Sequence, residues 1–526
     1  MSITRRAFLH RVARAGGAAA MFSAMQALGL APAAEASTLP DLPADFGKGR
    51  KVVVVGGGIA GLVTAYELRK AGFAPIVLEA AKRPGGRNWS ARNGTRVEFT
   101  DGIVQDCSWD EGHYMNMGPA RIPSIHRNLL GYCEELGVAL EVEINTSRST
   151  FMQADVLNGG KPVEQRRVIH DTRGYIAELL SKAIDRHTLD DVLTAQDRER
   201  LRAFLKGFGD LSEGNIYTGT ERGGFAVARG AGPVQEKYHK PLSLSELLAA
   251  DLSKGEFYEE HIDWQATMFQ PVGGMDRIPY AFAKSLGEIV KYGAPVTEIR
   301  NTSKGVRVSY GENGATRTID ADFCVCAMPA SILKDVKSNF APATKAAATA
   351  IPMTSLYKVG WQAPRFWEKE SNIYGGISFL KQPVDLVWYP SDRLFSKSGI
   401  VIAGFNLEYL PNGQPTEFGA LASTEARIAA SRMAVEKLHP GHGKDLTKPI
   451  YISWARVPYI QGATAMTTLP EMLGYYTQLN KADGQVWFAG DWLSRIVGWQ
   501  EGAILSAHRA VAGIAERVRA EGLKAA

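Results

Sequence analysis

Cysteine is scarce in this sequence. Only four cysteines occur among 526 residues, and their spacing matches no metal site, so no metal centre is predicted. Two of them, Cys324 and Cys326, alternate in a short apolar run that is typical of a strand, where buried thiols are common. The sequence specifies no disulfide, although oxidation of a cysteine pair after export would be compatible with it.

Long apolar runs and a strong excess of one charge are also absent. Beyond the N-terminus no stretch is long and apolar enough to span a bilayer, so we expect no stable membrane insertion of the mature chain. The formal net charge is +5, and residues 1–36 carry four arginines against one glutamate. The remaining chain is therefore close to neutral, has no basic stripe, and is not expected to bind nucleic acid.

The N-terminus has the pattern of a twin-arginine export signal. Thr4–Leu9 contains the arginine pair, Ala15–Ala31 is alanine-rich and mildly apolar, and Ala34–Ala36 is a small-x-small cleavage site. We therefore predict that residues 1–36 are a removable signal peptide. The mature protein would fold before export and reside in the periplasm or outside the cell.

The rest of the chain is organised around Val52–Gly61. A run of valines ends in Gly56-x-Gly58-x-x-Gly61 and is followed by apolar residues at helical spacing. This pattern predicts a strand, a tight turn and a helix N-terminus. Gly56 allows the turn, Gly58 lets the backbone approach a pyrophosphate, and Gly61 lets the helix pack on the strand. Free N–H groups and the positive end of the helix dipole favour a phosphate at this turn.

Two downstream features narrow the class of cofactor. A second predicted strand, Pro75–Leu78, ends in Glu79, where a carboxylate is expected to bind a ribose hydroxyl. The segment Arg83–Arg87 contains a glycine pair and resembles FAD proteins of the glutathione-reductase type rather than nicotinamide proteins. We therefore predict the α/β fold class, with a doubly wound FAD-binding domain.

The remaining predicted elements return to this domain twice. Residues 140–260 are expected to be mostly helical, and a helix is expected to start near Pro123 with Ile125 on its apolar face. Strands are predicted at 296–299, 306–310, 316–319, 323–328, 356–361, 386–389, 400–405 and 485–489. The FAD-binding domain is therefore expected to be discontinuous, with a mixed α+β substrate domain and a helical insertion.

We divide the chain into six segments on this basis. They are a signal peptide (1–36), the first part of the FAD-binding domain (48–138), a helical substrate domain (139–260), the second part of the FAD-binding domain (261–335), a substrate-binding sheet domain (336–465) and the third part of the FAD-binding domain (466–526). The sheet domain is expected to roof a substrate cavity.

Taken together, these motifs resemble the flavin monoamine oxidase family, and within it the bacterial L-amino acid oxidases. The resemblance covers nearly the whole chain after residue 50 and rests on motifs in a fixed order. They are Gly56–Gly61, Glu79, Arg83–Arg87, Gly118–Arg121, Gln270–Met275, Lys358, Phe488–Asp491 and Gly498–Ala503. The resemblance is weakest over residues 150–260, the region expected to shape specificity.

The resemblance implies that FAD is the cofactor and that it is bound noncovalently, because no cysteine lies beside the C-terminal motif. The residues expected to contact FAD are Gly56, Gly58, Ile59, Ala60, Gly61, Glu79, Ala80, Gly86, Arg87, Gly118, Pro119, Ala120, Arg121, Val296, Asp491, Gly498, Trp499, Gln500, Glu501, Gly502 and Ala503. A helix that starts near Gln500 would direct its positive end at the flavin ring.

The resemblance also assigns a carboxylate-binding pair. Arg121 lies in Gly118–Pro123, which looks like the segment that binds the substrate carboxylate. A guanidinium suits this role because it grips a carboxylate through two N–H groups. Tyr389 resembles the family tyrosine whose hydroxyl shares this carboxylate, although the neighbouring Trp388 leaves the register open by one residue.

Three further residues complete the expected substrate site. Lys358 matches the catalytic lysine that holds a water near the flavin, and a lysine inside an apolar strand is costly to bury without a role. Trp499 would form an aromatic wall of the substrate cage, and the carbonyl of Gly498 would accept from the substrate amine. None of the ten histidines can be assigned as a base.

These features predict oxidative deamination of L-amino acids by molecular oxygen in a homodimer. The products would be a 2-oxo acid, ammonia and hydrogen peroxide. Three alternatives stay open: an amide-forming aromatic L-amino acid 2-monooxygenase, a primary amine or polyamine oxidase, and a flavin-binding protein with a structural or partner-binding role. The sequence does not determine the side-chain specificity, but the aromatic candidates favour large apolar or aromatic L-amino acids.

Overall fold

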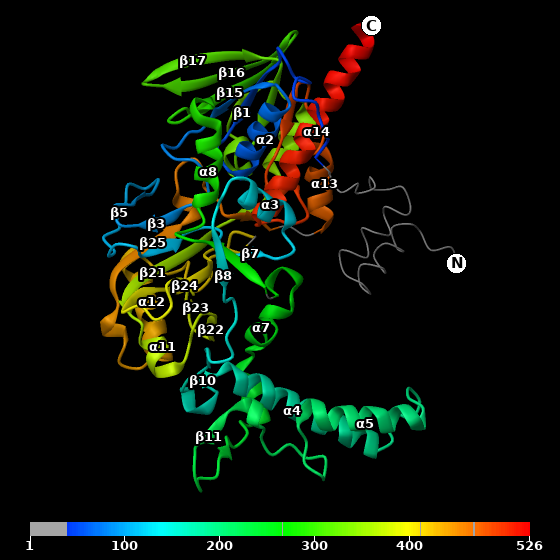
Figure 1. Ribbon diagram of the computed structural model, residues 1–526, viewed down its shortest axis with the longest axis vertical. Helices are drawn as coiled ribbons and strands as arrows, with labels where there is room; N and C mark the ends of the chain where they lie inside the picture. The colour runs from blue at the N-terminus through cyan, green and yellow to red at the C-terminus, as the bar shows by residue number, and fades with distance from the viewer. Residues whose placement is uncertain (1–38, 266, 411, 467–468, 526) are drawn as a thin grey trace.

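The computed structural model describes residues 39–525 except residues 266, 411, 467 and 468 (Figure 1). The predicted signal peptide, residues 1–36, lies outside the described residues and stays a prediction. Across the described part of the chain, no helix has the length and apolar character needed to cross a membrane.

A five-stranded parallel sheet forms the centre of the upper part of the molecule in Figure 1. Its strands, in spatial order, are β14 (Val290–Lys291), β2 (Ala74–Leu78), β1 (Lys51–Val55), β18 (Phe323–Cys326) and β27 (Val486–Phe488). Their near-continuous apolar runs are explained by layers on both faces, as is usual for parallel strands. The sheet therefore draws on the beginning, the middle and the end of the chain.

Two layers cover this sheet. On one face pack helices α2 (Ile59–Lys70), α8 (Arg277–Leu286) and α14 (Gln500–Ala525). On the other lies a four-stranded sheet of β17 (Ala315–Ala321), β16 (Gly305–Glu312), β15 (Val296–Thr302) and β19 (Lys337–Ser338). All four cysteines are buried and free, and Cys324 and Cys326 lie on β18 as the sequence predicts.

A seven-stranded sheet forms the second large layer. In spatial order its strands are β10 (Val163–Glu164), β9 (Phe151–Gln153), β22 (Ile377–Leu380), β23 (Leu386–Trp388), β24 (Ser398–Leu407), β21 (Leu356–Pro364) and β25 (Thr447–Ser453). Helix α12 (Thr424–Leu438) packs on it and begins where Ser423 Oγ accepts from the backbone N–H of Ala426 at 3.2 Å. The strands predicted at 356–361, 386–389 and 400–405 are confirmed.

A three-stranded sheet joins the two parts, and it corrects one prediction. Its strands are β7 (Ile122–Pro123), β13 (Met268–Pro271) and β8 (Leu140–Glu143). Because Ile122–Pro123 pairs with β13, this segment is extended, and helix α3 begins only at Arg127 and ends at Glu135. The predicted helix start near Pro123 is therefore wrong, and Ile125 is 47% exposed rather than part of an apolar face.

The helical insertion is shorter than expected. Residues 140–164 contain strands β8, β9 and β10 rather than helix, because they complete sheets whose other strands lie far away in the sequence. Helices α4 (Gln165–Asp185) and α5 (Ala195–Gly209) then form an arm that extends away from the rest of the molecule (Figure 1). The arm has its own small core around Ala177, Ile184 and Leu205.

The remaining elements are short. They are β3 (Ser90–Arg92), β4 (Arg96–Glu98), β5 (Val104–Asp106), β6 (Tyr114–Asn116), β11 (Phe225–Val227), β12 (Lys237–Tyr238), α6 (Leu244–Ala250), α7 (Ser253–Glu256), η3 (Tyr258–Glu260), η4 (Ile262–Trp264), α9 (Ala330–Leu333), α10 (Pro342–Thr349), β20 (Met353–Thr354), α11 (Phe366–Ser371), β26 (Thr464–Ala465) and α13 (Leu469–Leu479). Of these, η3 and η4 return the chain from the arm to the body of the molecule.

Candidate functional site

A cavity of about 1390 Å³ lies at the carboxyl ends of the parallel strands and reaches the seven-stranded sheet. Gly56 after β1, Glu79 after β2 and Ala327 after β18 line one end. Leu356–Lys358 on β21 and Phe405 on β24 line the other. Ligands of open α/β sheets bind at this edge, so the fold places the cavity where a cofactor is expected.

The glycine turn opens the backbone to this cavity. Gly56 has φ +101°, a conformation that favours glycine. A Cβ on Gly61 would lie 2.0 Å from the carbonyl oxygen of Gly56, so Gly61 lets α2 start against the turn. A Cβ on Gly58 would meet no protein atom within 4 Å, so the space beside Gly58 belongs to the cavity. This open backbone fits a pyrophosphate.

Glu79 is fixed at the end of β2. Its carboxylate accepts hydrogen bonds from the backbone N–H groups of Gly57 (2.6 Å) and Ala81 (2.7 Å). Burial raises the pKa of Glu79, while these N–H groups and the nearby Arg83 lower it. The carboxylate lines the cavity and keeps acceptor capacity for a ribose hydroxyl.

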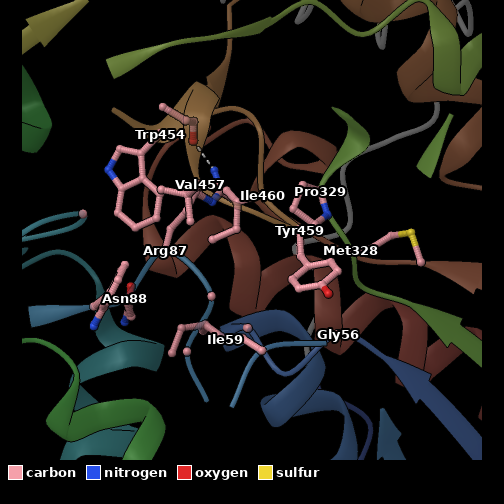
Figure 2. A pocket seen from close by; sticks show the side chains of 18 of the residues that line it. Gly56, Ile59, Arg87, Asn88, Met328, Pro329, Trp454, Val457, Tyr459 and Ile460 are labelled. Carbon is pink, nitrogen blue, oxygen red and sulfur yellow. Dashed lines mark hydrogen bonds between the residues drawn. The ribbon is translucent and has the colours of Figure 1, made fainter. Parts of the chain in front are cut away.

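Arg87 and Asp491 join the two ends of the cofactor domain across the cavity. Arg87 donates to Asp491 through both Nη atoms, and its Nη1 also donates to the carbonyl of Ala463. Asp491 in turn accepts from the backbone N–H of Gly498 at 3.0 Å. Arg87 and Trp454 face the same space from different segments (Figure 2). The ion pair between Arg87 and Asp491 therefore fixes the loop that precedes α14.

Most of the residues expected to contact FAD lie on the cavity wall. Besides Gly56, Gly58, Glu79, Arg87 and Asp491 they are Ile59, Ala60, Ala80, Gly86, Gly118, Pro119, Ala120, Arg121, Val296, Gly498, Trp499, Gln500 and Ala503. Gly61 was also expected to contact FAD, but it packs against the carbonyl of Gly56 and is not part of the wall. Ile59 and Ala503 are 444 positions apart in the sequence, and the fold brings them to the same cavity.

Two residues near the start of α14 are placed differently. The carboxylate of Glu501 accepts from the backbone N–H groups of Asn128 (3.2 Å) and Leu129 (2.9 Å), and so stabilises the N-terminus of α3. Neither Glu501 nor Gly502 lines the cavity, so the structure does not support the FAD contacts expected of these two residues. Gly502 packs under Ile496, whose carbonyl oxygen would lie 2.2 Å from a Cβ.

Arg121 lies at the far end of the cavity and is held on several sides. It is 6% exposed, and its Nη1 donates to Asn145 Oδ1 (2.8 Å) and to the hydroxyl of Tyr258 (3.1 Å). The rings of Trp264 and Trp388 lie 4.1 and 4.6 Å from the guanidinium carbon. Both hydrogen bonds that Arg121 makes within the described part of the chain start at Nη1. Its other N–H groups can therefore serve a carboxylate in the cavity.

Lys358 on β21 lies close to Arg121. Its Nζ donates to the carbonyls of Asn116 and Gly118, both at 2.7 Å. Burial, together with the charge of Arg121, lowers the pKa of Lys358 well below its ordinary value. The ammonium also lies 5.2 Å from the ring of Phe405. Lys358 is thus a buried, oriented donor on the cavity wall.

Two indoles form an aromatic corner of the cavity. The ring centroids of Trp499 and Trp264 lie 5.4 Å apart, with an interplanar angle of 63°. Behind Trp499 lies His126, at 5.0 Å between ring centroids. His126 Nε2 lies 3.2 Å from Asp263 Oδ1, and burial lowers the pKa of His126. His126 does not line the cavity, so it supports the corner and does not face a ligand.

Tyr389 does not reach the cavity. Its side chain is fully buried, and its hydroxyl is hydrogen-bonded to Ser378 Oγ (3.0 Å) and His439 Nε2 (2.8 Å). Successive side chains along an extended segment point to opposite faces, so Trp388 faces Arg121 and Tyr389 faces away. The prediction that the Tyr389 hydroxyl binds the substrate carboxylate is therefore wrong.

Several residues of the site were not predicted from the sequence. Asn145, Tyr258 and Trp264 surround Arg121, and Asn88 lines the cavity and donates to the side chain of Gln500. Tyr258 lies in the region where the sequence resembles the family least, and Trp264 follows that region by four residues. The aromatic composition of residues 257–264 is the one signal that could have drawn attention to them.

Fold and site together define a dinucleotide-binding protein. One end of its cofactor cavity is a buried chamber formed by Arg121, Lys358, Trp264, Phe405 and Trp499. The chain belongs to the flavin-containing amine oxidoreductases, because the sequence pattern of that family matches residues 59–515. The family implies a flavin cofactor, and the open backbone at Gly58 and the fixed carboxylate of Glu79 fit one.

The most similar curated relatives include L-amino-acid oxidases from snakes. The enzyme from Notechis scutatus scutatus is 26% identical over 87% of this chain and 85% of its own, and that from Naja atra is 27% identical over 88% and 87%. Among solved structures, a putrescine oxidase covers 89% of this chain and 99% of its own at 18% identity, with a TM-score of 0.57. Cyclohexylamine oxidase from Brevibacterium oxydans gives the same coverage and identity with a TM-score of 0.59. These structures establish the shared fold.

Proposed function

We propose that this protein is an FAD-dependent L-amino acid oxidase. It would convert an L-amino acid to a 2-oxo acid with release of ammonia and hydrogen peroxide. The observation that carries the proposal is Arg121, a buried guanidinium on the wall of the flavin cavity whose hydrogen bonds to other described residues use Nη1 alone. The names of the curated relatives, L-amino-acid oxidases, support the same activity.

FAD is the proposed cofactor, held without a covalent bond. No cysteine is among the cavity-lining residues in the described ranges, which supports noncovalent binding. When bound, FAD supplies the two-electron oxidation of the substrate carbon–nitrogen bond. Gly58 would hold the pyrophosphate, Glu79 a ribose hydroxyl, and the N-terminus of α14 the negative charge that reduction places on the ring.

The side chains of the chamber would bind and orient the amino acid. The free N–H groups of Arg121 would hold the carboxylate, and the carbonyl of Gly498 would accept from the amine. The Trp264 and Trp499 rings would confine the substrate and exclude water. Because the chamber walls are mainly aromatic, we infer that large apolar or aromatic L-amino acids are preferred.

Lys358 would hold a water molecule beside the reacting carbon. Two of its donor positions are used by backbone carbonyls, and the third remains for the water. The carbonyls of Asn116 and Gly118 fix the direction of the Lys358 side chain. The water that Lys358 binds would therefore have a fixed position. This arrangement supports a role in the oxidation or in the hydrolysis of the imino product.

Anaerobic mixing of the purified FAD-loaded protein with L-amino acids, D-amino acids and plain amines tests the proposal directly. Loss of flavin absorbance at about 450 nm reports reduction of the flavin. We expect bleaching by L-amino acids alone, followed in air by a 2-oxo acid and peroxide. Bleaching by plain amines would instead identify an amine oxidase, and an amide product would identify a monooxygenase. A protein that no amine bleaches would contradict catalysis.

We also propose a homodimer formed through the arm. Apolar side chains on α4 and α5 are exposed there: Ile176 (48%), Leu179 (53%), Phe204 (62%) and Phe208 (36%). Exposed apolar surface of this kind is typical of contact with another chain. Light scattering of the mature protein should give a dimer mass, and L179D with F204D should shift it to a monomer without loss of bound flavin.

Export by the twin-arginine route remains part of the proposal. It rests on the sequence of residues 1–36 alone. Replacing Arg5 and Arg6 by lysine should retain the protein in the cytoplasm, whereas the unaltered chain should appear in the periplasm or the medium without residues 1–36. Equal distribution of both proteins would contradict this route.

A further inference from the structure

A carboxylate that the proposed reaction does not use lies beside Arg121. Glu143 is the last residue of β8 and is 3% exposed. Among the described residues, neither of its oxygens has a hydrogen-bond partner of normal geometry, and the same holds for the indole nitrogen of Trp388, which faces it. Buried carboxylates are normally paired, because an unpaired charge is costly to remove from water. Packing alone does not account for Glu143.

The groups that face Glu143 identify its charge partner. Burial raises the pKa of Glu143 to about 7, and the guanidinium of Arg121 opposes this rise. The hydroxyl of Tyr258 on η3 faces both groups. On β13 the residue opposite Glu143 is the uncharged Met268, and Lys358 on β21 faces Arg121. Arg121 is therefore the cation that balances Glu143.

We propose that Glu143 is a positioning residue that balances the charge of Arg121 in the free enzyme and takes up one proton from solvent when a substrate carboxylate binds to Arg121. The inference rests on the proposed function, because it requires that Arg121 binds the carboxylate of an L-amino acid. The proton converts the Glu143 carboxylate to the neutral acid and returns to solvent when the product leaves. No bond to the substrate forms or breaks in this step.

The proton uptake follows from the number of charges in the chamber. One carboxylate faces the guanidinium in the free enzyme, and two face it once the substrate is bound. Two carboxylates that face the same guanidinium, away from water, repel each other, and this repulsion favours protonation of one of them. The substrate carboxylate would contact the cavity-facing N–H groups of Arg121, whereas Glu143 lies off the cavity wall without such a donor. Glu143 is thus the group that accepts the proton.

This coupling makes substrate affinity depend on pH. Below the pKa of Glu143 the proton is already in place, and above it the proton must be taken from solvent at increasing cost. The KM for an L-amino acid should therefore rise with pH, by up to about tenfold for each pH unit above about pH 7.5, while kcat follows the other ionisations of the site. A merely structural residue would not produce this KM effect.

The test compares the FAD-loaded wild type with E143Q, which keeps the shape of the side chain and removes its charge. Calorimetry of benzoate binding in two buffers of different protonation enthalpy, near about pH 7.5, counts the protons taken up. We expect more than about half a proton in the wild type and almost none in E143Q. In the same variant the KM for L-amino acids should become flat with pH.

Two further variants secure the interpretation. Glu141 lies two residues earlier on the same face of β8 and accepts from Gln270 Nε2 at 3.0 Å, so E141Q is the matched control and should keep the wild-type proton uptake. E143D retains the carboxylate and should retain the uptake. Equal proton uptake and equal KM profiles in wild type and E143Q would overturn the proposal. Absence of carboxylate binding together with oxidation of plain amines would overturn the proposed function as well.

Discussion

The side chain of Arg121 combines features that a carboxylate-binding residue requires. Asn145 and Tyr258 fix one end of the guanidinium, and the Trp264 and Trp388 rings hold its faces. The remaining donors are therefore oriented before a ligand arrives. Pre-orientation of this kind lowers the entropic cost of binding, so most of the interaction with the carboxylate is retained as affinity.

Replacement of Arg121 should mainly raise KM. Charge-assisted hydrogen bonds contribute about 1.5–3 kcal/mol, so Arg121→Ala is expected to raise the KM for L-amino acids by about 10- to 150-fold. Arg121→Lys keeps the charge but loses the two-pronged geometry and should have a smaller effect. Steady-state kinetics with the same amino acid measure both. A KM unchanged in both variants would show that Arg121 does not bind the carboxylate.

Tyr389 has a structural role that mutation can separate from catalysis. Its hydroxyl joins Ser378 on β22 to His439 at the end of α12. Tyr389→Phe should lower the free energy of unfolding by about 1–2 kcal/mol, because His439 loses its partner. Denaturant unfolding measures this loss, and the KM for amino acids should stay at the wild-type value. A large rise in KM would contradict the placement of this hydroxyl away from the cavity.

The three glycines of the turn between β1 and α2 have different roles. Gly56 needs a positive φ, Gly61 needs the absence of a Cβ against the carbonyl of Gly56, and Gly58 needs neither for folding. The conformation of Gly58, with φ −73° and ψ 178°, is accessible to any residue. The open space beside Gly58 is explained by the ligand.

Two alanine substitutions in this turn should therefore have different effects, one on FAD binding and the other on folding. Gly58→Ala is expected to fold normally but to bind FAD at least about tenfold more weakly, because its methyl group enters the pyrophosphate space. Gly61→Ala is expected to prevent correct folding, because its Cβ would lie 2.0 Å from a backbone oxygen. Circular dichroism and FAD titration distinguish the two. Unimpaired FAD binding by Gly58→Ala would contradict the proposed phosphate position.

The cofactor cavity connects the parallel sheet with the seven-stranded sheet. Its wall contains residues that follow β1, β2, β18 and β27, together with residues of β21 and β24 in the seven-stranded sheet. A ligand that contacts so many elements binds the folded state and not the unfolded chain. Flavin binding should therefore stabilise the whole protein.

Thermal unfolding of the apoprotein at increasing FAD concentration measures this stabilisation. At a thousandfold excess over Kd the linkage amounts to about 4 kcal/mol, and the midpoint should continue to rise with concentration. Riboflavin, which lacks the pyrophosphate, is the matched control and should give a smaller shift. Equal shifts with both ligands would show that the glycine turn contributes nothing to binding.

Features that depend on neighbouring residues could be predicted without the structure. The glycine spacing at residues 56–61, the carboxylate that follows β2 and the alternation of apolar residues depend on neighbouring positions, so strands and the cofactor turn could be predicted. Local patterns misjudged residues 122–125 and 140–164. These segments are extended because strands distant in the sequence pair with them.

The identity of the side chains around Arg121 depends on long-range packing and could not be predicted from local patterns. Tyr389 and Trp388 are adjacent in sequence, but the pairing of β23 with its neighbours sets which of them faces Arg121. Tyr258 and Trp264 lie on η3 and η4, which follow the arm in sequence. Glu143 lies on β8, in the three-stranded sheet between the two large sheets. Their proximity depends on packing between segments far apart in the chain. No spacing in the sequence records it.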